Sequence, residues 1–348
     1  MTRSCPGCRA GDDAIVRNGF FRRRCDSRRI QRFRCKACRC EFSAATASPC
    51  YRQKRRRINA QLGPLLASTG SIRRSARLLG VNRKTVARRL PMLAALARQR
   101  MARDRHRRFG TRGCEELQLD DLITLEHTKC KPVAVSVVIE SGTRRILGLD
   151  AAPIPASGPL AKMSRSRYGK RADGSRAMRN ALLAQLKPWI APDACFSSDD
   201  HRHYPVVIGR HFPGATHVRH PSKRACSGAQ GELKRAGHDP LFAINHTLAM
   251  LRANVNRLIR RTWCTTKRID RLVDHLTIYA DYHNRLLIKP VDVVEVVQRA
   301  ANLLETRHLN RELRSSNRAL NERLRVQEAL ERQAKDEHDR IVASISDV

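Results

Sequence analysis

The stretch LQLDDLITLE, residues 117–126, decides how the larger part of this chain folds. It is rich in Leu and Ile, and two segments of the same kind follow it, PVAVSVVIE at 132–140 and RRILGLDAA at 144–152, with turn residues between them. Short apolar runs broken by turn residues are typical of β-strands. The three runs therefore predict a β-meander.

Beyond the meander, helical and extended patterns alternate. We expect a loop rich in Pro, Gly, Ser, Lys and Arg over 153–173, a helix over 176–186, a strand at ACFSSDD (194–200) and a long amphipathic helix over 241–261. The segment ATHVRH (215–220) is a further candidate strand. This alternation predicts a mixed α/β domain, which we place at residues 113–290.

The charge of the chain is strongly positive and unevenly distributed. The 348 residues carry 69 Lys and Arg against 32 Asp and Glu, a formal charge of +37, of which +25 falls in residues 1–110. Such an excess repels itself unless a polyanion is bound, so nucleic acid is the expected partner. No apolar run approaches the roughly 18 residues of a membrane span, and the N-terminus has no signal-peptide core. We therefore expect a cytoplasmic, bacterial protein that associates with the nucleoid and not with membranes.

Four of the twelve cysteines form two C-x-x-C pairs, Cys5/Cys8 and Cys35/Cys38, with 26 residues between the pairs. Each pair can present two thiolates to one tetrahedral Zn²⁺, and the intervening chain is long enough for a hairpin. Residues 1–50 are therefore predicted to be a zinc ribbon. Four unrelated reduced thiols are the alternative, and Cys40 is the best substitute ligand.

Residues 51–112 are predicted to be a helical, helix-turn-helix domain. Apolar positions between Ser71 and Leu93 fit two short helices that meet at Gly80, and Asn82 can cap the second helix. That helix would direct basic side chains to a DNA groove or its phosphates, namely Arg83, Lys84, Arg88 and Arg89. A basic hairpin that contacts only phosphates is the alternative.

Two acidic pairs stand out in so basic a protein. Asp120 and Asp121 lie in the first predicted strand, and Asp199 and Asp200 follow the apolar residues of the strand at 194–200. Carboxylates at such positions can bind Mg²⁺, but acidic residues also end strands as solvated turn formers.

The chain resembles bacterial insertion-sequence transposases of the DDE superfamily that carry a zinc ribbon and a helix-turn-helix ahead of a ribonuclease H-like core. The resemblance covers about residues 1–290, and its motifs are LQLDDLITLEHTK (117–129), FSSDDHRHYP (196–205) and FAINHTLAMLRANVNRLIRRTWCTTKR (242–268), in the family order. It implies a multidomain protein: zinc ribbon, helix-turn-helix, α/β ribonuclease H-like catalytic domain and a charged helical tail at 291–348, either a short coiled coil or a solvated helix.

The resemblance also implies a metal-binding triad. Asp120 matches the first ligand and Asp199 the second, while Asn245 stands where the commoner pattern has Glu. An Asp-Asp-Asn triad lowers the charge of the site from about −3 to −2 and weakens attraction of Mg²⁺ or Mn²⁺. Glu232 is the rival third ligand, and Arg252, two helical turns after Asn245, is expected to hold a DNA phosphate.

The implied function is DNA transposition. The protein would bind the double-stranded terminal inverted repeats of its element, cleave them in a metal-dependent reaction and join them to target DNA, acting as a dimer or larger assembly. Two alternatives remain open at this point: a catalytically silent DNA-binding regulator derived from a transposase, and a nuclease that cuts without joining.

Overall fold

The computed structural model describes residues 3–221, 239–259 and 263–288, together with five separate positions in the C-terminal tail. The chain divides into two units, Met1–Ile288 and Lys289–Val348. Two predictions, Glu232 as a metal ligand and the seam of the coiled coil, fall outside the described residues. Everything below concerns the first unit.

The N-terminal segment forms a three-stranded antiparallel sheet. Its strands are β1 (Ile15–Arg22), β2 (Arg29–Cys35) and β3 (Glu41–Ser43), in the order β1-β2-β3, after a short 3-10 helix η1 (Asp12–Ala14). The rings of Phe33 and Phe42, on neighbouring strands, have centroids 5.5 Å apart. Few large side chains are buried here, so the sheet has little apolar core of its own.

Three helices follow: α1 (Ile58–Ala67), α2 (Ile72–Leu78) and α3 (Arg83–Phe109). The predicted turn and cap are confirmed, because Gly80 has a positive φ of 57° and the side chain of Asn82 accepts a hydrogen bond from the backbone N–H of Lys84 at 2.8 Å. Apolar side chains of all three helices share one core, which includes Leu62, Leu66, Ala76, Val86, Leu90 and Leu93.

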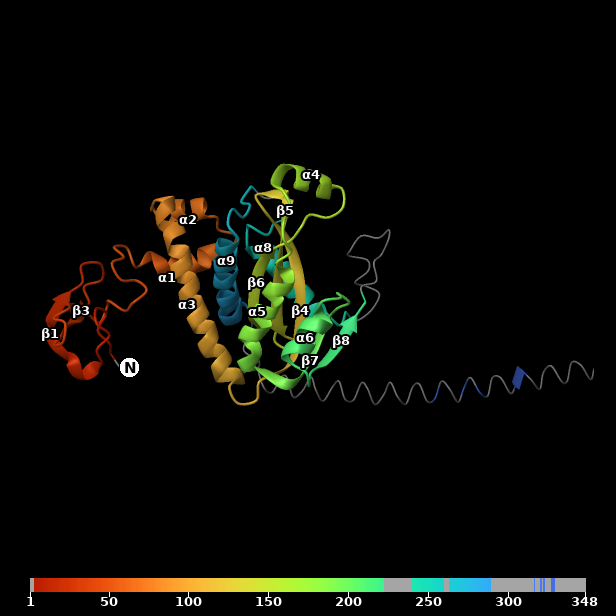
Figure 1. The fold of residues 1–348 in the computed structure, drawn as a ribbon, viewed down its shortest axis with the longest axis horizontal. Coiled ribbons are helices and arrows are strands. Elements are labelled where there is room, and N and C mark those ends of the chain that lie inside the picture. Colours follow the sequence, from red (N-terminus) through yellow and green to blue (C-terminus); the bar gives the residue numbers. More distant parts are fainter. Residues whose placement is uncertain are drawn as a thin grey trace, which may run out of the picture. The chain divides into compact units, whose positions relative to one another are not determined.

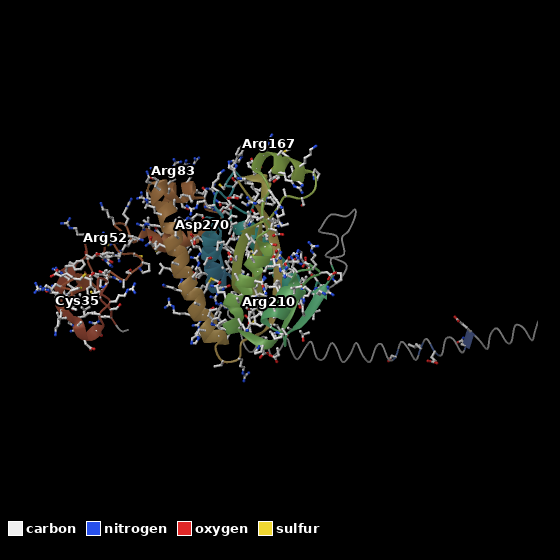
Figure 2. All side chains as sticks on the ribbon, in the orientation of Figure 1. Cys35, Arg52, Arg83, Arg167, Arg210 and Asp270 are labelled. Atoms are coloured by element: carbon white, nitrogen blue, oxygen red, sulfur yellow. The ribbon has the colours of Figure 1, made fainter. Side chains whose placement is uncertain are left out.

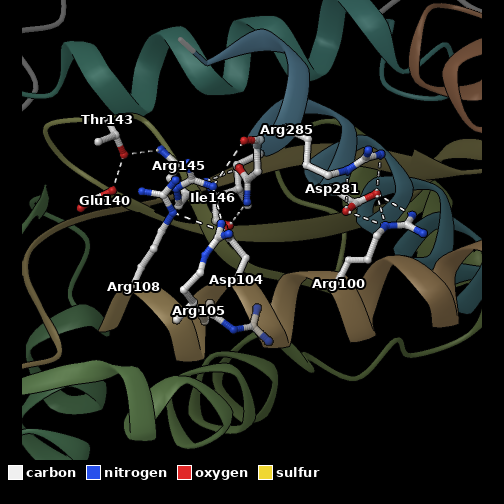
Figure 3. A network of polar contacts seen from close by, with 12 residues as sticks. Arg100, Asp104, Arg105, Arg108, Glu140, Thr143, Arg145, Ile146, Asp281 and Arg285 are labelled. Carbon is white, nitrogen blue, oxygen red and sulfur yellow. Dashed lines mark hydrogen bonds and ion pairs between the residues drawn. The ribbon is translucent and has the colours of Figure 1, made fainter. Parts of the chain in front are cut away.

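Helix α3 is much longer than the short helix expected between Asn82 and Leu93, since it continues through the basic segment at 101–109. One side of its second half is buried, where Met101 and Phe109 pack in the two cores of the large sheet. Ion pairs tie it to helix α9 (Ile269–Tyr282), including Arg100 with Asp281 at 2.6 Å (Figure 3). The apolar residues and paired arginines keep the segment helical.

A five-stranded mixed sheet follows, in the order β6-β5-β4-β7-β8. The predicted meander is confirmed as β4 (Cys114–Glu126), β5 (Thr128–Glu140) and β6 (Ile146–Pro153), which pair antiparallel. Strand β7 (Ile190–Asp199) pairs parallel with β4, and β8 (Thr216–His220) pairs parallel with β7. Gly113, which joins α3 to β4, has φ 78° and approaches the backbone of Ala191 so closely that a side chain would clash.

Helices cover both faces of this sheet (Figure 1). On one face pack α5 (Ser175–Leu186) and α6 (Tyr204–His211), and on the other α8 (Phe242–Asn254) and α9. Short helices η2 (Lys187–Trp189) and η4 (His283–Leu287) complete the described elements, together with α4 (Leu160–Tyr168), which lies where a loop was expected. Since each face of the sheet is buried, side chains that alternate along β4 enter two different environments.

Two further differences concern the helices at the end of this unit. Helix α8 ends at Asn254, earlier than predicted, and α9 was not anticipated. In the described part of the chain no helix is both long enough and apolar enough to cross a membrane.

Candidate functional site

The four cysteines of the two C-x-x-C pairs come together. Their Sγ atoms all lie within 4.8 Å of one another, with Cys5 and Cys38 at 3.5 Å and Cys8 and Cys35 at 3.6 Å. A tetrahedron with Zn–S bonds of about 2.3 Å places its sulfurs about 3.8 Å apart. The cluster therefore fits a zinc ion and a zinc ribbon.

The backbone shapes both pairs in the same way. The carbonyl oxygen of Cys5 accepts a hydrogen bond from the N–H of Arg9, and that of Cys35 accepts one from Arg39, both at 2.9 Å. Arg9 and Arg39 have positive φ values of 61° and 58°. Hydrogen bonds from backbone N–H groups, first that of Cys8, lower the pKa of the Cys5 thiol to about 6. Two equivalent turns thus bring four sulfurs together, and at Cys5 the backbone favours the thiolate, the form that binds zinc, whereas hydrogen bonds from the neighbouring thiols and burial raise the pKa of Cys8.

Asp120 and Asp199 also come together, on neighbouring strands of the large sheet. Leu119 of β4 is in register with Ser198 of β7, and the two aspartates are the next residues along these parallel strands. Asp120 is the seventh of the 13 residues of β4, whereas Asp199 is the last residue of β7. Both side chains are half-buried. The pairing of these strands brings together two carboxylates that are 79 positions apart in the sequence.

The environment of Asp120 disfavours its charged form. Burial, followed by the negative charges of Asp199 and Asp121, raises the pKa of the Asp120 carboxyl to about 7. The N–H of Asp121 and the charge of Arg252 act in the opposite direction but do not cancel this rise. The rise in the pKa of the Asp120 carboxyl therefore comes mainly from burial, and the neighbouring carboxylates add to it.

Asp121 points to the opposite face of β4, where other side chains engage it. Arg179 of α5 donates to it from Nη2 at 2.5 Å and from Nε at 3.1 Å, and the hydroxyl of Ser136 on β5 donates to its other oxygen. Both partners of the ion pair are largely buried. Of the two neighbouring aspartates, Asp120 is thus the one free of a direct Arg partner among the described ion pairs.

Asn245 lies in the first turn of α8, with an exposed side chain whose Nδ2 donates to the carboxylate of Asp239 at 2.9 Å. The start of this helix is attached to β4 by the buried Gln118, a residue that the sequence analysis did not identify. Its amide nitrogen donates to the Pro240 carbonyl and its amide oxygen accepts from the Ile244 N–H, each at 2.9 Å. Gln118 precedes Asp120 by two residues on the same strand, so the start of α8, which carries Asn245, is attached to the strand that carries Asp120.

The helix α8 also carries Arg252, seven residues after Asn245 and half-buried. Its charge acts on Asp120, as expected for a cation on the same side of the sheet. A helix turns through about two turns in seven residues, so Asn245 and Arg252 lie along one line of the helix surface.

The basic residues predicted to bind DNA separate into two groups. Arg83, Lys84 and Arg88 are exposed at the start of α3. Arg89 instead faces the interior, where its guanidinium donates to the backbone carbonyl of Arg55 at 2.8 Å and to the side chain of Asn59. The prediction that Arg89 faces DNA is therefore wrong, because this side chain is buried and holds α3 to the start of α1 and the residues before it.

Comparisons with known proteins give limited information. No family model and no curated protein matches the chain. Among solved structures it is similar to the cryo-electron microscopy structure of the simian T-cell lymphotropic virus intasome in complex with PP2A regulatory subunit B56 gamma, at 12% identity and a TM-score of 0.15. The match covers 53% of this chain and 61% of that chain. So weak a likeness carries no argument, and function is inferred below from the geometry of the site.

Proposed function

We propose that this protein is an insertion-sequence DNA transposase whose residues 113–290 form a ribonuclease H-like catalytic domain. One observation carries the proposal: Asp120, midway along the first strand of the sheet, lies beside Asp199, at the end of the fourth strand. A ribonuclease H-like site requires this placement. The strand order β6-β5-β4-β7-β8, with the first three strands antiparallel and the others parallel to β4, agrees with it.

The residues around this pair have distinct roles in the proposal. Asp120, Asp199 and Asn245 would hold Mg²⁺ or Mn²⁺, because adjacent carboxylates are the ligands these cations prefer and Asp120 has no Arg partner among the described ion pairs. Bound there, the metal would activate a water molecule or the 3′-hydroxyl of the DNA and would stabilise charge on the phosphate. Arg252 would hold the phosphate beside the carboxylates, and the pair of Asp121 with Arg179 would fix the strand behind them.

The N-terminal segments would bind the double-stranded ends of the element. In the proposal the cysteine cluster holds a structural Zn²⁺ and α2 and α3 form the helix-turn-helix. The exposed Arg83, Lys84 and Arg88 would contact base edges or phosphates. Two ends must be brought together for joining, so the active assembly would be at least a dimer.

The test is a cleavage and joining assay on labelled duplexes that carry the DNA flanking the coding sequence, in Mg²⁺ and in Mn²⁺. We expect Asp120→Asn and Asp199→Asn each to abolish both products while leaving DNA binding intact. Asp200→Asn is the matched control, because this neighbouring carboxylate is exposed and paired with Arg219 at 3.0 Å. It should cleave and join like the wild type.

The third ligand is tested in the same assay with Asn245→Ala and Glu232→Gln. Loss of activity in the first variant alone supports the Asp-Asp-Asn site, and loss in the second alone assigns the ligand to Glu232. Cleavage without joining would indicate a nuclease. Binding of the ends without cleavage in either metal would overturn the proposal in favour of a catalytically silent regulator.

A further inference from the structure

The segment from Ile154 to Arg176 combines a high positive charge with an unexpected helix, and nothing in the proposed mechanism uses it. It contains six Lys and Arg residues and one acidic residue, Asp173. The sequence pattern predicts a loop here, but α4 occupies its centre. A loop would disperse these charges over many conformations, whereas a helix holds them in a fixed arrangement.

Side-chain contacts attach the helix to the ends of strands β4 and β5. The hydroxyl of the buried Ser164 donates to the carbonyl of Cys130, on β5, at 2.7 Å. Beyond the helix, Arg171 forms an ion pair with Glu126 at 2.9 Å, and the ammonium of Lys131 lies 4.6 Å from the centre of the Tyr168 ring. These contacts hold α4 and the residues just after it at the point where β4 passes into β5.

Four cations on this attached segment face the solvent: Lys162, Arg165, Arg167 and Lys170. No ion pair given for the described part of the chain involves them, in contrast to Arg171. Like charges held this close together repel one another, and an anionic ligand with several charges relieves that repulsion. The side chain of Arg167 extends from the end of the core opposite to Arg210 (Figure 2).

The distance between this segment and the carboxylate pair can be compared with the spacing of phosphates along duplex DNA. Glu126, to which Arg171 is bound, lies six residues beyond Asp120 on the same strand, which corresponds to about 20 Å. Phosphates of one strand of duplex DNA are spaced by about 3.4 Å along the axis. The end of β4, where the segment is attached, therefore lies about six base pairs along a duplex from the carboxylate pair, and α4 lies beyond that end of the sheet (Figure 1).

We propose that α4 and Lys170 form a clamp for the phosphate backbone of duplex DNA, at least about six base pairs from the phosphate that is cut. The position of the cut rests on the proposed function, whereas the binding of duplex DNA by this surface does not. The contacts are to phosphates and carry no base specificity, because the side chains are long, flexible cations without an adjoining groove-reading element.

The test compares two variants with equal loss of charge. In the first, Arg165, Arg167 and Lys170 are changed to Gln. In the control, Arg112, Lys187 and Arg210 are changed to Gln. Arg112 and Lys187 precede the parallel strands β4 and β7, so they lie at the end of these strands opposite to Glu126. Binding of a fluorescein-labelled duplex of arbitrary sequence is measured by anisotropy over a series of NaCl concentrations, without divalent cations so that no cleavage occurs.

Each lost phosphate contact reduces the slope of log K against log[salt] by about 0.9, so the α4 variant should lose about 2.7 units of slope. The control should lose less than about one unit. Circular dichroism of both variants checks that they are folded. Equal slopes for the two variants overturn the clamp, and this result is independent of whether Asp120 and Asp199 cleave DNA.

Discussion

The cysteine cluster and the carboxylate pair are each made by two short segments, but different forces bring the segments together. In the cluster, the turns after Cys5 and Cys35 have the same hydrogen bonds and the same positive φ, so each half is shaped locally. In the carboxylate pair, neither strand defines the site, and only the parallel pairing of β4 with β7 places Asp120 beside Asp199. The first site therefore depends on its ligand ion and the second on the packing of the whole sheet.

The largest effect is expected at the cluster, because the small sheet of residues 15–43 has little apolar core. Removing a ligand with Cys35→Ser should abolish zinc binding, and structural zinc contributes on the order of 10 kcal/mol to such modules. We expect about one zinc per chain in the wild type and almost none in the variant, by elemental analysis, with rapid proteolysis before residue 58. Cys40→Ser is the control and should keep its zinc. Full zinc content in Cys35→Ser would assign the ligand to Cys40.

Behind the carboxylate pair, the buried pair of Arg179 and Asp121 tests dependence on packing. Arg179→Met leaves Asp121 buried without its cation, which should cost about 3–5 kcal/mol in the free energy of unfolding measured with urea. Arg219→Met breaks an exposed pair with Asp200 and should cost less than about 1 kcal/mol. Similar costs for the two variants would contradict the structural role of the buried pair.

We expect acid to weaken the contact between helices α9 and α1 through His275 of α9. Its Nε2 lies 2.7 Å from the carbonyl oxygen of Leu66, and burial, followed by the charge of Arg257, lowers its pKa to about 4. Since the unfolded chain binds the proton more tightly, the stability is full above about pH 6.5 and falls as the pH approaches 4, by on the order of 3 kcal/mol.

His275→Gln removes this titration while retaining an amide donor for the Leu66 carbonyl. Urea unfolding between pH 4 and 7 should give a flatter dependence on pH for the variant than for the wild type. Parallel curves would show that the loss of stability in acid arises elsewhere, for example from release of zinc.

The smallest effect is expected where Gln118 attaches α8 to β4. Gln118→Met removes the hydrogen bonds to Pro240 and Ile244 and should cost about 1–2 kcal/mol. Hydrogen exchange at the Ile244 amide should accelerate in this variant. Ser141→Ala removes only the 3.3 Å contact with the same amide group and should leave that exchange unchanged.

The features that the sequence predicts correctly depend on residues close together in the chain, and those it misses depend on contacts between distant residues. The C-x-x-C pairs, the Asn82 cap and the alternation of the strands are local patterns, and each is found in the structure. The buried state of Arg89 is not visible in the sequence, because Arg55 and Asn59 lie 30 or more positions away and all the neighbouring arginines look alike. Gln118 is missed for the same reason, as its partners are over 120 positions distant.

Helix α9 is a different case, because the sequence does contain the pattern of an amphipathic helix at this point. Ile269, Leu272, Leu276 and Tyr279 follow the spacing of an amphipathic helix and are packed against the sheet or the helices beside it. Side chains alternate between the two faces of a strand, so the sequence also shows that Asp120 and Asp121 lie on opposite faces of β4. Only the fold shows that Arg179 contacts Asp121.

The length of α3 has a consequence for how this protein can diversify. One unbroken helix of 27 residues, about 40 Å long, begins at the exposed Arg83 and ends at the buried Phe109. Inserting a single residue would rotate one end of the helix relative to the other by about 100° about the helix axis and lengthen the helix by about 1.5 Å. Substitutions at Arg83, Lys84 and Arg88 leave this phase unchanged. In the proposed function, new DNA preferences would therefore arise by exchanging these three residues on a helix of constant length.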